Sequence, residues 1–351
     1  MPGPGKCPDV TIEATPLILP ATLSLLPTPA GPISARVVDV LGDAWTSSDD
    51  AVDVDGADPY GLDLHLALYT CYELHYRGFD GVSGSWEWNP SLLELRARLE
   101  RVFLEAVRRD VGDADPDETV TDAMAALSIE PVDGTGLSYH LRDVGTWEQM
   151  REHFVHRSLY HLKEADPHAF AIPRLTGTAK SAFVAVQNDE YGAGRGQRMH
   201  QQLFADLLEA AELDATYLGY LDHVPADALS VVNLMSLFGL HRDLRGAAVG
   251  HFASTEITSP PGSARIVAAL ERLGAPETCA IFYREHVEAD AVHEQVVRRD
   301  VVGDLVAREP SLEADVIFGI RARDVVEDRL ADHMVASWQA GRSSLRIPLT
   351  Q

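Results

Sequence analysis

The sequence predicts an all-α protein, a multi-helix bundle preceded by additional N-terminal helices and an irregular N-terminal arm. Two observations predict this class. From Leu62 onward apolar residues recur at three- and four-residue spacing, which is the period of an amphipathic helix. Few segments have the strict alternation of a strand, and none alternates well enough to build a sheet. No internal repeat is detectable, so an α-bundle follows.

Composition and charge bound the class of protein. The chain has 351 residues, 46% of them hydrophobic, which is ample for a sizeable core. Its three cysteines (Cys7, Cys71 and Cys279) lie far apart, so neither a disulfide framework nor a thiolate metal site is expected. The 29 basic and 54 acidic residues give a formal charge of −25, which repels nucleic acid and anionic membrane surfaces. We therefore expect a cytoplasmic protein without a nucleic-acid or membrane partner.

The N-terminal part divides into two predicted regions. Residues 1–60 are rich in Pro and Gly and end in an acidic stretch, which predicts an extended arm and an acidic loop. The apolar segment over residues 15–26 contains two prolines and is interpreted as a loop or extended segment, not a signal peptide. Residues 61–140 are predicted to form a helical extension, with helices at residues 62–76, 92–111 and 120–127.

Residues 141–345 are predicted to form the principal helical domain, after a loop over residues 131–145. Thr146 is a suitable cap for a helix over residues 147–165, which stops before Pro167. Periodicity predicts further helices at residues 175–191, 199–211, 226–240, 246–257, 264–273, 276–299 and 312–339.

The sharpest chemical signal is the spacing of His286, Asp290 and His293 on the helix predicted over residues 276–299. At about 100° per residue the three side chains fall within roughly 60° of one another, on one face of the helix. Two imidazoles and a carboxylate without a thiolate suit Fe(II), Mn or Zn. A helix face with two solvated histidines and an ordinary aspartate would show the same spacing, so the motif is insufficient alone.

Further candidate ligands lie on other predicted helices. These are Glu164, Glu190, His200 and Glu256. Each of these residues alone is weak evidence for a metal site, because most glutamates on helices are solvated. Together with the motif they supply four carboxylates and three imidazoles, and the four negative charges balance two Fe(II) ions when the imidazoles bind as neutral ligands. Three histidines before Glu164 (His153, His156 and His161) are interpreted as lying on the surface or beside the ligands.

Glu190 and His200 cannot share a compact site on a straight helix. Ten residues apart, they would be about 15 Å apart along the axis and roughly 80° apart around it. Three glycines between them, at positions 192, 194 and 196, permit a kink or an unwound turn. A plain loop between two helices is the alternative.

This set of residues resembles that of the haem-oxygenase-like diiron oxidases and oxygenases, often described as iron-containing redox enzymes. The resemblance covers residues 147–299, and the helix over residues 312–339 fits the same bundle of about seven core helices. In that family four core helices supply, in order, a Glu, a His, a Glu and a His-x3-Asp-x2-His run. The resemblance gives these roles to Glu164, His200, Glu256, His286, Asp290 and His293.

The same resemblance implies an activity. Family members that oxygenate nitrogen have one more carboxylate ahead of the second-helix His, and Glu190 stands in that place. The expectation is two Fe ions cycling between Fe(II) and Fe(III), O2 as co-substrate, and a small organic substrate, with amine N-oxygenation favoured over desaturation or C–C cleavage. An external electron donor is expected, because no dinucleotide-binding fingerprint follows a predicted strand. A homodimer is a reasonable expectation, and no catalytic residue beyond the metal ligands is identified.

Three other interpretations stay open at this point. A haem-binding relative of the same fold would need a proximal histidine on the first core helix. A metal-binding protein without turnover would keep the ligands and consume no O2. A mononuclear zinc hydrolase would use His286, Asp290 and His293 as its sole ligands.

Overall fold

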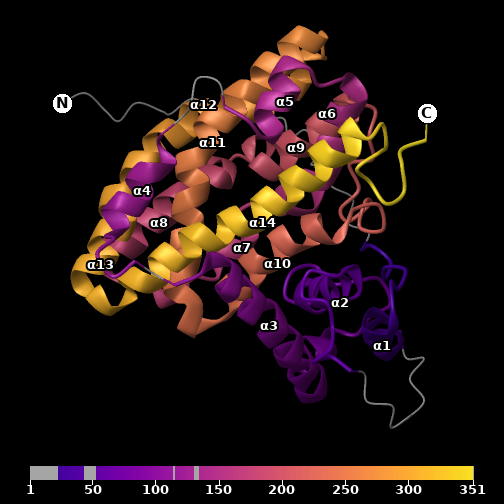
Figure 1. Cartoon of the computed structure of the whole chain (residues 1–351), viewed down its shortest axis with the longest axis horizontal. Coiled ribbons are helices and arrows are strands. Elements are labelled where there is room, and N and C mark those ends of the chain that lie inside the picture. The colour runs from indigo at the N-terminus through magenta and orange to yellow at the C-terminus, as the bar shows by residue number, and fades with distance from the viewer. Residues whose placement is uncertain (1–22, 43–52, 114, 130–133, 351) are drawn as a thin grey trace, which may run out of the picture.

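The computed structural model describes residues 23–42, 53–113, 115–129 and 134–350, and in these ranges the chain is helical without a strand (Figure 1). The predicted all-α class is confirmed. The α-helices are α1 (Pro32–Leu41), α2 (Leu62–Glu73), α3 (Pro90–Val111), α4 (Val120–Leu127), α5 (Leu137–Asp143), α6 (Trp147–His161), α7 (Asp166–Ala169), α8 (Gly177–Glu190), α9 (His200–Ala210), α10 (Ala226–Leu240), α11 (Arg245–Leu273), α12 (Glu277–Val296), α13 (Asp304–Arg308) and α14 (Glu313–Gln339). No helix in the described ranges is long and apolar enough to cross a membrane.

Local sequence explains where several helices begin. The Thr146 hydroxyl accepts a hydrogen bond from the backbone N–H of Gln149, whose side chain bonds back to Thr146, so a capping box starts α6. Asn89 caps α3 in a similar way, with Pro90 at the first helical position, where its missing N–H costs nothing. Both helices begin within two residues of where the sequence predicts them.

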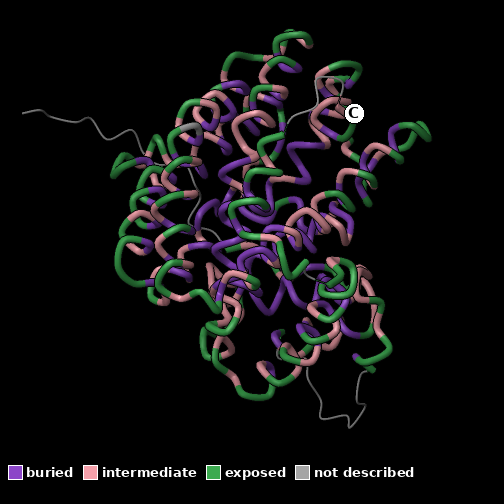
Figure 2. The backbone as a smooth tube through the Cα atoms, turned by 60° about the vertical axis from the view of Figure 1, so that its left-hand side comes forward, coloured by how far each residue is buried: buried purple, intermediate pink, exposed green. Residues whose placement is uncertain are grey.

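The centre of the bundle is the contact of α11 with α14 on one side and α12 on the other. Figure 1 shows α14 running diagonally across the bundle, and Figure 2 shows the buried backbone gathered along its middle. The α11–α14 crossing is unusually close. A Cβ atom on Gly250 would lie 1.9 Å from the Val316 carbonyl oxygen, and one on Gly319 would lie 2.1 Å from the Ala247 carbonyl oxygen. Only glycine allows this approach of the two backbones.

The N-terminal extension packs on the bundle through several helices: α2 contacts α10, α3 contacts α14, and α4 contacts both α11 and α14. Every residue from Leu64 to Glu73 is buried, and α2 contacts α1, α3 and α10. A single hydrophobic core includes side chains of α1, α2 and the bundle helices α6, α9 and α10. The predicted region boundaries at residues 60 and 140 therefore stay a prediction. In the structure, α2 shares a hydrophobic core with helices of the bundle.

Two short helices lie where the sequence predicted irregular chain. α1 falls inside the predicted arm, because the Asp63 carboxylate accepts hydrogen bonds from the N–H groups of Ile33 and Ser34, at 2.9 and 2.7 Å. α5 falls inside the predicted loop over residues 131–145, because Arg272 of α11 donates to the Leu141 carbonyl at 2.7 Å. Both are stabilised by distant residues. Residues 1–22 and 43–52 of the predicted arm and acidic loop lie outside the described residues.

The two helices predicted over residues 246–257 and 264–273 are one helix, α11. It continues through Pro260 and Pro261. A proline inside a helix removes a backbone hydrogen bond and usually ends or kinks the helix. Here α11 packs against both α12 and α14, and this tertiary packing offsets the lost hydrogen bonds.

Candidate metal centre

The seven residues predicted as metal ligands converge in the interior of the bundle, and each is at most 6% exposed. They form two groups, in each of which the ligand atoms lie within 4.8 Å of one another. The first group is Glu164, Glu190, His200 and His286, and the second is Glu190, Glu256, Asp290 and His293. Glu190 belongs to both groups. The geometry is therefore that of two adjoining cation sites that share one carboxylate.

The α12 motif connects the two groups. His286 Nε2 lies 3.3 Å from Glu164 Oε1 in the first group. Further along the same helix, His293 Nδ1 lies 3.2 Å from Glu256 Oε2 in the second. Asp290 Oδ1 is 3.3 Å from His293 Nδ1. The predicted common face of this helix therefore exists, and it points into the core.

The glycine break brings Glu190 and His200 together, as the sequence predicted. α8 ends at Glu190 and α9 begins at His200, and the connecting residues include Gly192 and Gly194 at φ values of 74° and 80°. A Cβ atom on Gly192 would lie 2.7 Å from the Met199 nitrogen, so the chain could not turn this tightly with a larger residue. As a result Glu190 Oε2 lies 2.7 Å from His200 Nδ1.

Glu164 does not lie on a helix. The sequence predicted a helix over residues 147–165, but α6 ends at His161 and Glu164 occupies the turn that follows. His161 Nδ1 lies 3.1 Å from Glu164 Oε2, beside the ligands as predicted. His153 and His156 are buried away from the surface, and His156 Nε2 lies 2.9 Å from the Ser344 hydroxyl.

Asp189 is a residue near the centre that sequence reasoning missed. Its Oδ2 lies 3.3 Å from His293 Nε2, the ring nitrogen opposite the one that faces Glu256. A carboxylate in this position fixes the orientation of a histidine ligand and increases its basicity. Nothing in the spacing of the sequence singles out Asp189, because it contacts a helix more than 100 residues away.

Proximity of so many carboxylates changes the protonation of the histidines. Burial lowers the pKa of His286, but the negative charges of Glu164 and Asp290 outweigh it and hold the pKa well above the usual value. Burial acts in the same direction on His293, yet its bonds with Asp290 and Glu256 raise its pKa to about 11. Burial and the Asp290 charge raise the pKa of Glu256 to about 8. Without a metal, protons therefore compensate the negative charge of the site.

The donor set fits iron. Glu164 Oε2, His200 Nδ1 and Asp290 Oδ1 are buried and make close contacts, but none has an aligned hydrogen bond. Buried polar atoms normally have such a partner. A cation in the first group would satisfy Glu164 Oε2 and His200 Nδ1, and one in the second group would satisfy Asp290 Oδ1. Imidazole nitrogens and carboxylate oxygens without sulfur are suitable ligands for Fe(II). The described cysteines, Cys71 and Cys279, are not in either group.

We predict that metal binding releases protons. Fe(II) requires neutral imidazoles, whereas His286 and His293 carry protons at pH 7 in the metal-free site. Loading both groups at pH 7 should release about three protons, one each from His286, His293 and the Glu256 carboxyl, whose pKa is about 8. Between pH 6 and 8 the apparent affinity should rise about tenfold per pH unit for the first group and more steeply for the second. Calorimetric titration in buffers of different ionisation enthalpy measures the release. An affinity that is equal at pH 6 and pH 8 would contradict these protonation states of the two histidines.

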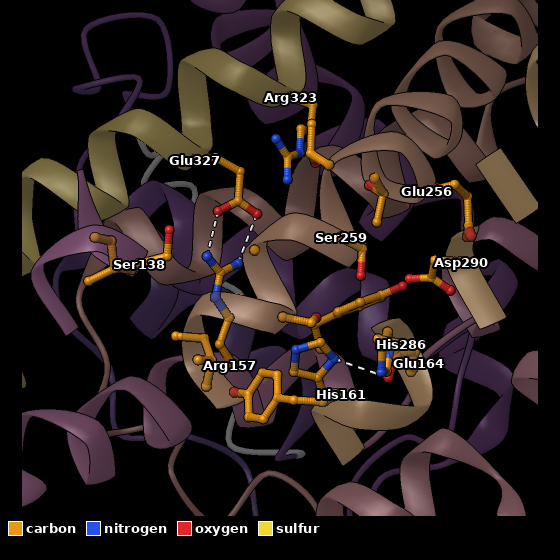
Figure 3. A pocket seen from close by; sticks show the side chains of 18 of the residues that line it. Ser138, Arg157, His161, Glu164, Glu256, Ser259, His286, Asp290, Arg323 and Glu327 are labelled. Atoms are coloured by element: carbon orange, nitrogen blue, oxygen red, sulfur yellow. Dashed lines mark hydrogen bonds and ion pairs between the residues drawn. The ribbon is translucent and has the colours of Figure 1, made fainter. Parts of the chain in front are cut away.

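A cavity of about 420 Å³ reaches the candidate metal centre from the side of α14. Five of the ligands line it: Glu164, Glu190, Glu256, His286 and Asp290. Across the cavity Arg157 donates two hydrogen bonds to Glu327, at 2.8 and 2.7 Å, and Arg323 lies beside them (Figure 3). The cavity can hold a small organic molecule between the ligands and this polar wall.

A second cavity, of about 430 Å³, reaches the centre from the side of the glycine break. His200 and His293 line it, together with Asp189 and Arg195. The two cavities touch different ligands, so the centre lies between them.

Two comparisons with known proteins bear on this centre. Residues 151–328 match the sequence model of a family described as iron-containing redox enzymes. A nitrosourea synthase from Streptomyces achromogenes subsp. streptozoticus is 25% identical over 160 residues, which are 45% of this chain and 34% of that protein. The match thus spans about a third of the length of this relative. All seven candidate ligands lie within the residues that match the family.

Proposed function

Because residues 151–328 match its sequence model, the chain belongs to the iron-containing redox enzyme family, and we propose that it is a non-haem diiron enzyme that uses O2 to oxidise a small organic substrate. The observation that supports this most strongly is the pair of ligand groups that share Glu190. A mononuclear site would need only one such group. A haem site would not surround the metal with four carboxylates.

The residues of the proposed site have distinct roles. The two ligand groups would hold iron, which would supply the redox chemistry that O2 activation requires. Glu190, which belongs to both groups, would contribute a ligand to each ion. The four carboxylates would balance their charge, so that an uncharged group of the substrate can approach without an electrostatic penalty.

The lining of the cavity suits a small organic substrate. The candidate metal ligands form one side of the cavity, and the hydrogen-bonded Arg157–Glu327 pair forms a polar wall on the opposite side. Phe252, Phe282 and Tyr283 also line the cavity and contribute apolar surface. Apolar walls exclude water from the reacting atoms, and the polar wall orients the molecule.

N-oxygenation of an amine is the reaction we propose first. Glu190 supplies the extra carboxylate, and the similar nitrosourea synthase is named for a product that contains a nitrogen–oxygen bond. The balanced step is RNH2 + O2 + 2 electrons + 2 protons giving RNHOH + H2O. One oxygen atom forms the N–O bond and the other leaves as water, so an external electron donor must supply the two electrons. Desaturation or C–C cleavage at the same centre is the alternative.

Oxygen consumption tests the proposal. Protein loaded anaerobically with Fe(II) and then mixed with O2 is expected to consume O2 and to show a transient broad visible band. With a reductant and a panel of primary amines, mass spectrometry is expected to find a product heavier by one oxygen atom. Protein loaded with Zn(II) is the control for bound metal without redox chemistry. Equal O2 uptake by wild type and Glu190→Ala would instead indicate adventitious iron.

A further inference from the structure

The helix α2 lies outside the residues that match the family, yet it contacts the chain around one metal ligand. We propose that α2 positions Glu164, and that the buried Glu73–Lys163 ion pair is the principal contact through which it does so. The inference rests on the proposed metal centre and gives the N-terminal extension a role in it. Glu73 and Lys163 are positioning residues in this account, since neither touches the ion.

Glu164 needs such a contact because its own backbone does not fix it. α6 ends at His161, and Ala165, directly after Glu164, has a φ of 72°. A left-handed conformation is unfavourable for alanine and persists only where surrounding structure imposes it. The side chain of Glu164 nevertheless has to reach both His161 and His286. Tertiary contacts must therefore hold this turn.

The Glu73–Lys163 pair supplies the first of these contacts. Lys163 immediately precedes Glu164, and its Nζ lies 2.9 Å from Glu73 Oε2, with both residues at most 1% exposed. The ammonium also lies over the rings of Tyr69 and Tyr76, at 4.4 and 4.2 Å from their centroids. The second carboxylate oxygen of Glu73 accepts a hydrogen bond from the Tyr217 hydroxyl at 2.8 Å.

A second set of contacts holds the backbone of the same turn. Arg77, which follows α2, donates to the Leu162 carbonyl at 3.2 Å and to the Gln201 side chain at 3.0 Å. Gln201 in turn donates to the Glu164 carbonyl at 3.0 Å. Gln201 is the neighbour of the ligand His200. These bonds therefore connect the chain that follows α2 to the segments that carry two ligands of the first group, Glu164 and His200.

The energetics favour a positioning role over a stabilising one. A buried ion pair costs much of its Coulomb attraction in desolvation, and replacing both partners by apolar residues of similar size is often neutral for stability. Removing one partner leaves an unpaired buried charge and is strongly destabilising. The double variant Glu73→Leu/Lys163→Met therefore separates the two roles. It removes the ion pair without leaving a buried charge.

The experiment measures Co(II) binding to the first group alone. In the Glu256→Ala background the second group lacks a ligand, so tight binding reports the first group. Adding Glu73→Leu/Lys163→Met to this background is expected to weaken Co(II) binding by about 10- to 100-fold. In the His200→Ala background, which reports the second group, the same double replacement is expected to leave the affinity within about threefold, below the range for a lost ligand contact. Glu73→Gln keeps the shape of the side chain but leaves Lys163 without its charged partner. It should also weaken the first group alone, and it should lower the temperature of unfolding more than the double variant does.

A matched control uses another buried contact of α2. Asn233 of α10 donates to the carbonyl of His65 on α2 at 2.9 Å, far along the helix from Glu73. Asn233→Leu is expected to lower the temperature of unfolding and to leave Co(II) binding unchanged. Unchanged affinity of the first group in both Glu73 variants, or equal weakening of both groups, would overturn the inference. Wild-type protein that binds no Co(II) would overturn it together with the proposed function.

Discussion

Replacing Glu256 or His293 by Ala is expected to lower the iron bound tightly per chain from about two ions to about one. Both residues belong to the second group only, so the first group keeps all its ligands. Removing one of four ligands leaves an incomplete site, and the buried partners around it lose the cation that balances them. Metal analysis after anaerobic Fe(II) loading and gel filtration measures the change.

The other ligands give complementary results. His200→Ala should remove the ion of the first group and leave that of the second, while Glu190→Ala should weaken both, because Glu190 belongs to both groups. Glu288→Ala is the matched control, since Glu288 is an exposed carboxylate on the same helix α12. Unchanged stoichiometry in both Glu256→Ala and His293→Ala would refute the assignment of ligands.

Adding a methyl group at the α11–α14 crossing is expected to be the most destabilising small change elsewhere in the bundle. Gly250→Ala and Gly319→Ala should each lower the free energy of unfolding by about 3 kcal/mol. In both cases the new Cβ atom meets a backbone carbonyl of the facing helix, at 1.9 and 2.1 Å, and a backbone cannot move aside as a side chain can. Urea denaturation followed by circular dichroism measures the loss.

Another glycine of α11 provides the control for this prediction. A Cβ atom on Gly262 would meet nothing within 4 Å. Gly262→Ala should therefore be neutral or should stabilise the protein by up to about 1 kcal/mol, since alanine favours the helix over glycine. If Gly250→Ala and Gly319→Ala change the free energy of unfolding no more than Gly262→Ala does, α11 and α14 do not approach each other as closely as the structure shows.

Local patterns predicted two features of the candidate site, the common face of the α12 motif and the chain break between Glu190 and His200. The spacing of His286, Asp290 and His293 places them on one helix face whatever the fold, because helical geometry alone decides it. The glycines between Glu190 and His200 are a local signal as well, since positive φ values favour glycine. These features depend on residues close together in sequence, and the structure has them where they were expected.

Features that depend on distant residues were not predicted. α1 is capped by Asp63 and α5 by Arg272, each from another helix. Asp189 reaches His293 across more than 100 residues of sequence. The contact of Glu73 with Lys163 spans 90 residues. In each case the pairing follows from how the helices pack, which periodicity along the chain does not reveal.

The number of Fe(II) ions bound per chain tests the central claim most directly. Anaerobic titration of metal-free wild-type protein with Fe(II) should reach saturation at about two tightly bound ions, one for each group that shares Glu190. Saturation at one ion, or no tight binding, would contradict the diiron centre and with it the proposed chemistry.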